Sequence, residues 1–332
     1  MALGWHPMRP KDVRECAEII ASQPVIGPRY GAAIADLRPA WLRLLGCEAT
    51  RTAVYEETEA DRVRIVGMGF GVFVSDEFVR ELKRPPMFWF GPELVKRTMR
   101  GISPVLSDEE VRRANTSGGL NLLVWESFSN LKPANQSALY RLMVGVFVEV
   151  YRGFLLKEMI TSQMESVERL HWAVDAGAFC WDPIRACYIK SLEESPDEYV
   201  RKPHLVGLTP ELEASRRGSW VGAIFDYHKP RFSFSPAEQH LLLAALRTDR
   251  GTDQELAREL SVSLPTIKKT WLSVYDRISE CEPTLIPCWR EPGGETSKRG
   301  KEKRRRLLAY LRDHPEELRP RERPTSFKGS AR

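Results

Sequence analysis

The sequence predicts an α/β or α+β N-terminal domain, then an all-α domain, then a basic C-terminal helix. Three observations support this order. Strand-type and helix-type segments alternate up to about residue 190, whereas capping signals and helical apolar periodicity concentrate after residue 230. Residues 291–332 hold 13 Lys and Arg against 7 Asp and Glu. We therefore expect three parts, residues 1–228, 229–290 and 291–332.

The composition is typical of a protein that folds in water. It has 332 residues, of which 42% are hydrophobic and 29% are charged. No apolar stretch approaches the ~20 residues of a membrane helix, and the first residues lack a signal-peptide pattern, so we expect a cytoplasmic protein without membrane contact. The six cysteines are too sparse for a disulfide framework, and their spacing does not suit a zinc site. We expect no metal and no cofactor.

Several elements of the first part follow from periodicity. A helix over 9–20 has Val13, Cys16, Ala17 and Ile20 at helical spacing, with Asp12 near its start. Ser75 or Asp76 is placed to cap a helix that runs to Leu82. The remaining expectations are a strand over 62–74, as one strand or two with a bulge, a strand over 120–125, and helices over 136–150 and 154–176.

Three helix starts are visible in the second part. Ser235 and Glu238 form a capping box around Pro236, which predicts a helix that runs to about Leu246. Thr252 and Glu255 repeat the capping box and open a short helix that ends near Leu260. After the turn 261–263, the Ser263 hydroxyl is placed to cap a third, longer helix. A short helix, a tight turn and a longer helix are the parts of a helix-turn-helix.

The third helix has two unlike faces. Ile267, Trp271, Val274 and Ile278 recur at helical spacing and are expected to point inward. The opposite face is small, polar and basic, as a helix that enters the DNA major groove requires. Its candidate DNA-contacting residues, together with the cap, are Ser263, Leu264, Thr266, Lys268, Lys269, Thr270 and Ser273. An ordinary surface helix without nucleic acid is the alternative.

This region resembles the LuxR-type (GerE-like) DNA-binding domain over about 45 residues. The resemblance rests on Ser235-Pro236-Ala237-Glu238, Leu256-Ala257 with Leu260, Val262-Ser263, Thr266-Ile267-Lys268 and Ile278. It implies that Thr266, Lys268 and Lys269 contact phosphates or base edges, and that Thr270 and Ser273 lie further along the groove. It also implies that Ile267, Val274 and Ile278 hold the helix against the core.

Two segments that follow the third helix bear on dimerisation and on partners. The family's dimerisation helix falls at 282–287, where Pro283 and Pro287 disfavour a helix, so a homodimer stays an open alternative. Residues 298–306 carry seven basic residues around Glu302 and lead into Leu307, Leu308 and Leu311. This predicts a basic amphipathic helix that lies along DNA phosphates, packs its leucines on a partner, or sits on an anionic membrane.

The first part holds a second resemblance. Arg64, Gly67 and Gly69 match the R-x-x-G-x-G pyrophosphate loop of GCN5-related (GNAT) acetyltransferases, and Arg9, Pro10 and Asp12 are similar to that family's first strand-to-helix turn. Such a loop leads into a helix N-terminus. Here the glycines lead into 70–74, which is strand-forming sequence, so we favour an inactive GNAT-like or other ligand-sensing fold.

Two functions therefore compete. The first is a bacterial-type transcriptional regulator whose partner is double-stranded DNA and whose N-terminal part senses a small molecule or a protein. It has no catalytic residue. The second is an acyl-CoA-dependent N-acyltransferase with an appended DNA-binding module. We favour the regulator.

Overall fold

The strand-forming segment Arg62–Val74 forms a single long strand, β3, which is hydrogen-bonded on both sides. Its pairing shifts register between Phe70 and Gly71, as a bulge does. The expected strand over 62–74 is thus confirmed, with a bulge inside it. Gly67 and Gly69 lie within this strand, so the Arg64–Gly69 segment is not the loop at a helix start that the pyrophosphate hypothesis needs.

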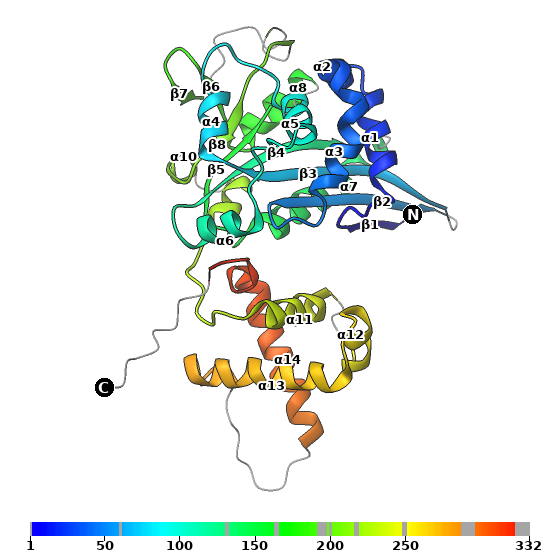
Figure 1. Ribbon diagram of the computed structural model, residues 1–332, viewed down its shortest axis with the longest axis vertical. Coiled ribbons are helices and arrows are strands. Elements are labelled where there is room, and N and C mark those ends of the chain that lie inside the picture. The colour runs from blue at the N-terminus through cyan, green and yellow to red at the C-terminus, as the bar shows by residue number, and fades with distance from the viewer. Residues whose placement is uncertain are drawn as a thin grey trace. The chain divides into compact units, whose positions relative to one another are not determined.

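The computed structural model describes residues 2–59, 62–129, 133–162, 166–190, 198, 201–215, 219–247, 251–286 and 296–322. The chain divides into two compact units, Met1–Asp226 and Tyr227–Arg332, and Figure 1 shows the elements of each. No helix among the described residues is both long enough and apolar enough to cross a bilayer.

One mixed sheet of eight strands organises the first unit, in the order β1-β2-β3-β4-β5-β8-β6-β7. Its pairs are antiparallel except β4 with β5, which are parallel. The mixed α and β character of the chain is as expected. Besides β3, the strands are β1 (Ala2–His6), β2 (Thr50–Glu59), β4 (Leu120–Ser129), β5 (Leu156–Thr161), β6 (Phe179–Asp182), β7 (Cys187–Ile189) and β8 (Val206–Leu208).

Helices cover both faces of this sheet. One face packs in a single core with α1 (Val13–Ser22), α2 (Ile26–Tyr30), η1 (Gly31–Asp36), α3 (Leu37–Leu44), α4 (Asp76–Leu82) and α5 (Phe90–Met99). The other face packs with α6 (Asp108–Thr116), α7 (Pro133–Tyr151), α8 (Val167–Asp175) and η2 (Val221–Phe225). A short helix, α10 (Pro210–Ala214), follows β8.

Most local expectations for this unit are confirmed. The four spaced residues of the first helix are the buried residues of α1, and Ser75 caps α4 by accepting a hydrogen bond from the Phe78 N–H. The expected strand over 120–125 continues to Ser129 as β4, and the helix over 136–150 is α7.

The expected helix over 154–176 is correct for Val167–Asp175 and wrong for the residues before it. The chain instead forms β5 and then α8 in this stretch. Gly153, with φ 84°, follows the end of α7, and Leu156–Thr161 then pairs alongside β4. The spacing by about four of Leu155, Met159, Ser162, Ser166 and Leu170 misled the prediction. Glu158, Met159 and Ile160 of β5 are consecutive and all buried, so the segment shows no strand-type alternation.

Four helices and a 3-10 turn form the described part of the second unit: α11 (Pro236–Arg247), α12 (Asp253–Glu259), α13 (Leu264–Cys281), α14 (Thr296–Asp313) and η3 (Pro315–Leu318). Their buried residues make one core, to which Leu307, Leu308 and Leu311 of α14 contribute. The sequence set residues 291–332 apart as a tail, but the described portion of that segment belongs to the helical core. These leucines are therefore unavailable to a partner or a membrane.

Candidate nucleic-acid interface

The α12–α13 pair is set by its caps and by one unusual backbone position. Thr252 and Glu255 form the expected capping box at α12, and Ser263 caps α13 by accepting a hydrogen bond from the Thr266 N–H at 3.3 Å. Between the helices, Ser261 adopts a left-handed conformation with φ 54°, which glycine adopts more readily than serine does. The turn is therefore made with a serine in the conformation that glycine usually supplies.

The inner face of α13 is the one predicted. Ile267, Trp271, Val274 and Ile278 are all buried, with exposed fractions between 0% and 4%. They pack in the same core as Leu256 of α12 and Leu241 of α11. Because this face is fully used, the opposite face of α13 must point to solvent.

The seven predicted residues differ in what their polar groups do. Lys268 and Lys269 are exposed, and neither ammonium forms an ion pair with any residue in the described part of the chain. Thr266 is exposed and its hydroxyl lies 2.8 Å from that of Ser263. The Thr270 hydroxyl donates to the Thr266 carbonyl at 2.9 Å. The two lysines thus have donors that no described residue uses.

Ser273 has a partner that the sequence did not indicate. Its hydroxyl donates to Oε1 of Glu238, a carboxylate of α11 whose side chain is 3% exposed, at 2.7 Å. Arg277 pairs with the same carboxylate at 3.2 Å. Leu264, at the other end of the predicted face, is half-buried. Ser273 therefore joins α13 to α11, and its hydroxyl proton is already engaged.

The charge state of Glu238 follows from these contacts. Burial raises the pKa of the carboxyl, but hydrogen bonds from Ser235 and Ser273 and the charge of Arg277 outweigh it, so the pKa lies below its ordinary value. Glu238 also accepts the Ser235 N–H at 2.6 Å, which completes the capping box of α11. One carboxylate thus caps α11 and positions α13.

Arg304 has a role that was not predicted from the sequence. Its guanidinium lies over the Trp271 ring, 4.3 Å from the ring centre, and it forms an ion pair with Asp253 at the start of α12. It also donates to the Gly251 carbonyl at 3.3 Å. A signal was present, because Arg304 precedes Leu307, Leu308 and Leu311 by three, four and seven residues and so shares their helix face.

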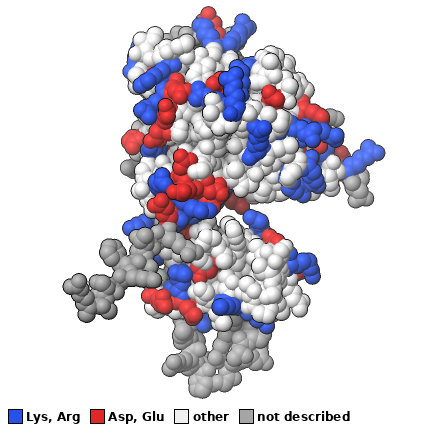
Figure 2. All heavy atoms as spheres, in the orientation of Figure 1, with Lys and Arg blue, Asp and Glu red and all other residues white. Residues whose placement is uncertain are grey.

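Apolar side chains also lie near the exposed face. Leu272 is 62% exposed on α13 and Val262 is 41% exposed in the turn before it. In the major groove, apolar side chains contact the methyl group of thymine. By contrast, Figure 2 shows basic and acidic residues interspersed over the visible face of the first unit, so no field of one sign marks that face.

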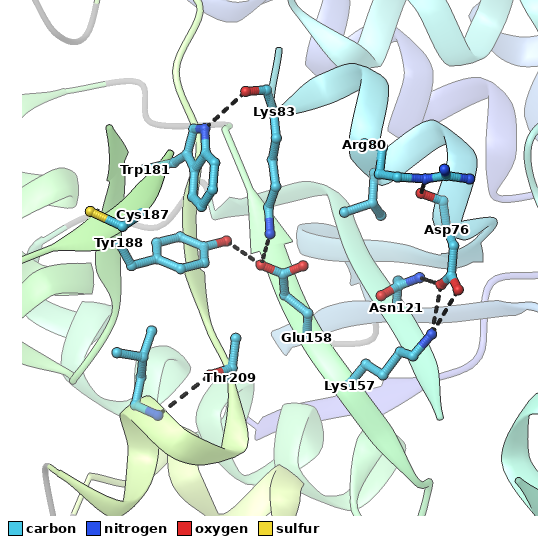
Figure 3. A pocket seen from close by; sticks show the side chains of 12 residues that line it. Asp76, Arg80, Lys83, Asn121, Lys157, Glu158, Trp181, Cys187, Tyr188 and Thr209 are labelled. Atoms are coloured by element: carbon cyan, nitrogen blue, oxygen red, sulfur yellow. Dashed lines mark hydrogen bonds and ion pairs between the residues drawn. The ribbon is translucent and has the colours of Figure 1, made fainter. Parts of the chain in front are cut away.

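A second candidate site is an open pocket in the first unit, drawn in Figure 3. Lys83 and the Tyr188 hydroxyl both reach Oε1 of the buried Glu158, at 2.5 and 2.6 Å. The ammonium of Lys83 also lies over the rings of Trp181 and Tyr188, at 4.6 and 5.1 Å from their centres. The pocket's buried acid is therefore neutralised by neighbours within the protein.

The other acid of this pocket is matched in the same way. Asp76 accepts hydrogen bonds from Lys157 at 2.8 Å and from Asn121 at 2.7 Å. These hydrogen bonds, Lys157 first, lower the pKa of Asp76 although partial burial opposes them. Within the described residues, no group of three His, Cys, Asp or Glu side chains is placed to hold a metal ion. We therefore interpret the pocket as a set of structural ion pairs.

The chain gives no match to any protein-family model, any curated protein or any solved structure.

Proposed function

We propose that this protein is a DNA-binding transcriptional regulator in which α12 and α13 act as a helix-turn-helix. The observation that carries the proposal is the contrast between the two faces of α13. One face is buried to the last side chain, and the other carries Lys268 and Lys269 without protein partners in the described part of the chain. A partner with negative charge on two rows, as duplex DNA has, fits that arrangement.

The dimensions of α13 suit this role. An α-helix with its side chains is about 10–12 Å wide, and the major groove is about 12 Å wide. α13 has 18 residues, so it extends about 27 Å. The exposed side of its first turns is available to the groove, while its buried side packs in the core. Its exposed N-terminal turns carry no acidic side chain that would repel phosphates.

The side chains divide into two kinds of DNA contact. Lys268 and Lys269 are suited to phosphates or to guanine edges, and Leu264, Leu272 and the methyl groups of Thr266 and Thr270 to thymine methyls. Ser263 stands at the helix N-terminus, where backbone N–H groups and the helix dipole favour a phosphate. Ser273 serves mainly to hold α13 on α11, because its proton is engaged by Glu238.

Fluorescence anisotropy with labelled duplex DNA at several salt concentrations tests the proposal on the full chain. We expect Lys268→Glu with Lys269→Glu to weaken binding at least tenfold and to reduce the log–log salt slope by about two, because each lysine releases about one counterion. The matched control is Lys11→Glu with Lys96→Glu, which makes the same charge change on two exposed lysines of the first unit. Equal loss in both double variants would contradict the proposal.

The proposal also includes a cellular location, a signal-binding unit and a homodimer. A regulator of this type acts in the cytoplasm on chromosomal DNA, and its first unit is the natural place for a signal to bind. A homodimer would double the contacts, as two half-sites do in related architectures. Analytical ultracentrifugation with and without duplex DNA measures whether the protein forms a homodimer.

A further inference from the structure

A cavity of about 160 Å³ lies in the first unit between the sheet and the helices α7 and α8. Apolar side chains dominate its walls, among them Val124, Val144, Val146, Phe147, Met159 and Val206. Engineered apolar cavities of ~150 Å³ stay free of water and bind molecules as large as benzene.

Two glycines of β3 mark where the space begins and ends. A methyl group built on Gly69, which lines the cavity, would meet no atom within 4 Å. One built on Gly71 would overlap the hydroxyl of Tyr151, which closes that end. The void therefore lies over Gly69 and is bounded at Gly71 by a side chain of α7.

Arg51 is the charged group at the closed end. Along β2, side chains alternate between faces, so Arg51, Ala53 and Tyr55 point to the same side, and all three line the cavity. Nη1 of Arg51 donates to the Thr50 carbonyl at 3.0 Å, and the guanidinium lies 5.0 Å from the centre of the Phe154 ring. Burial lowers the pKa of Arg51, although Tyr151, Glu48 and Asp108 oppose that effect.

This guanidinium has no carboxylate within ion-pair distance among the residues that the structure describes. The nearby Glu48 is paired with Arg112 at 2.5 Å. At the far end of the cavity, Arg169 is engaged by other groups, because it donates to the Ser129 hydroxyl at 2.8 Å and lies over the Tyr140 ring. Arg51 is thus the cation that an incoming anion would compensate.

The register of the sheet gives the length available to a ligand. Arg51 pairs with Gly71 of β3 at one end of the cavity. At the other end, Ser129, which accepts a hydrogen bond from Arg169, pairs with Gly67 of β3. The two ends therefore lie four residues apart along β3. At ~3.3 Å per residue this is about 13 Å. A molecule of six to eight carbons fits within that distance.

We propose that this cavity binds a small apolar carboxylic acid, with its carboxylate on the Arg51 guanidinium and its hydrocarbon part between α7 and the sheet. The carboxylate accepts charge-assisted hydrogen bonds, and the tail packs against the apolar walls of the cavity. This site goes beyond DNA binding and does not depend on it. A regulatory effect of this ligand on DNA binding would require the proposed function as well.

Hexanoate is the probe, and methyl NMR on the full chain is the measurement. We expect hexanoate to shift the methyl resonances of Val124, Val146 and Val206, which line the cavity. The uncharged analogue 1-hexanol should bind at least about tenfold more weakly, because it cannot form the charge-assisted pair. Absence of shifts at these methyl groups, or equal affinity for 1-hexanol, would overturn the proposal without any mutation.

Variants then locate the carboxylate. Arg51→Met should weaken hexanoate binding about tenfold or more, while Arg169→Met at the other end should change it less than about threefold. Val144→Phe should fill the space and abolish the shifts, with an unchanged far-UV circular dichroism spectrum. Full affinity in Arg51→Met, or full binding in Val144→Phe, contradicts the assignment. None of these measurements contains DNA, so their outcome is independent of the anisotropy experiment.

Discussion

The guanidinium of Arg304 lies 4.3 Å from the centre of the Trp271 ring, which joins α14 to the outer edge of the core beneath α13. Trp271 in turn stacks on Tyr275, with ring centres 5.7 Å apart. The same guanidinium pairs with Asp253, so one side chain connects α14 to both α12 and α13. The position of α13 thus depends on a residue outside the α11–α13 set.

We expect Arg304→Met to loosen these helices. Loss of the stacking and of a half-buried ion pair should lower the opening free energy of α12 and α13 by about 1 to 2 kcal/mol. Arg305→Met is the control, because Arg305 is 75% exposed and pairs only with Glu302 among the described residues. Native-state hydrogen exchange of the α13 amides measures the difference. Equal exchange in the two variants would show that Arg304 contributes only surface charge.

Glu238 should make the second unit sensitive to acid. Its pKa is lower in the folded chain than in the unfolded one, so its stabilising effect is complete above the ordinary value of about 4.3 and is lost as pH falls through the folded pKa. Glu238→Gln should therefore be less stable than wild type near pH 7, and the gap should narrow below about pH 4. Hydrogen exchange of α11 amides across this range tests it. Glu280→Gln, on an exposed position of α13, should show no such gap.

Gly71 and Gly69 provide a matched pair in one strand. Gly71→Ala should destabilise the first unit by about 1 to 3 kcal/mol, because its new methyl group overlaps the Tyr151 hydroxyl. Gly69→Ala places the same methyl group in open space and should cost little. Thermal unfolding of both variants decides the matter. If Gly69→Ala were the more damaging substitution, the cavity would not lie where it is described.

The ion pair in the pocket of Figure 3 should matter for stability. Glu158→Gln leaves Lys83 without its acid in a site where the two side chains are 20% and 8% exposed. We expect a loss of about 2 kcal/mol, which lowers the melting temperature of a unit of this size by about 4 to 8 °C. Asp76→Asn, at a 62% exposed carboxylate, is the control with a smaller shift. Calorimetry compares them.

Sequence reasoning succeeded where one local signal decided the structure. Ser75, Thr252 and Ser263 each cap the helix that they were expected to cap, since an N-cap depends only on residues a few positions away. The buried positions of α1 and α13 followed from helical periodicity in the same way. The DNA-contacting face of α13 rests on this second kind of signal and stays a prediction.

It failed where distant residues decide. Leu156–Thr161 is a strand because β4 lies beside it, and nothing within that segment announces its neighbour. The engagement of Ser273 by Glu238 joins residues 35 positions apart, so the hydroxyl could be counted only as exposed. The cavity beside Arg51 lies between β2 and α7, and its lining residues are far apart in the sequence, so no local pattern indicates it.

The contribution of α14 to the core has a consequence for synthesis of the protein. Leu307, Leu308, Leu311 and Leu318 seal apolar surface on α11 and α13 from far downstream in the chain. While the ribosome is still adding these residues, Leu241 and Ile278 have no cover from them. A protein truncated after Cys281 would keep that surface exposed permanently, and an exposed apolar surface of this kind promotes aggregation. The core of the second unit can therefore be completed only after these leucines have been synthesised.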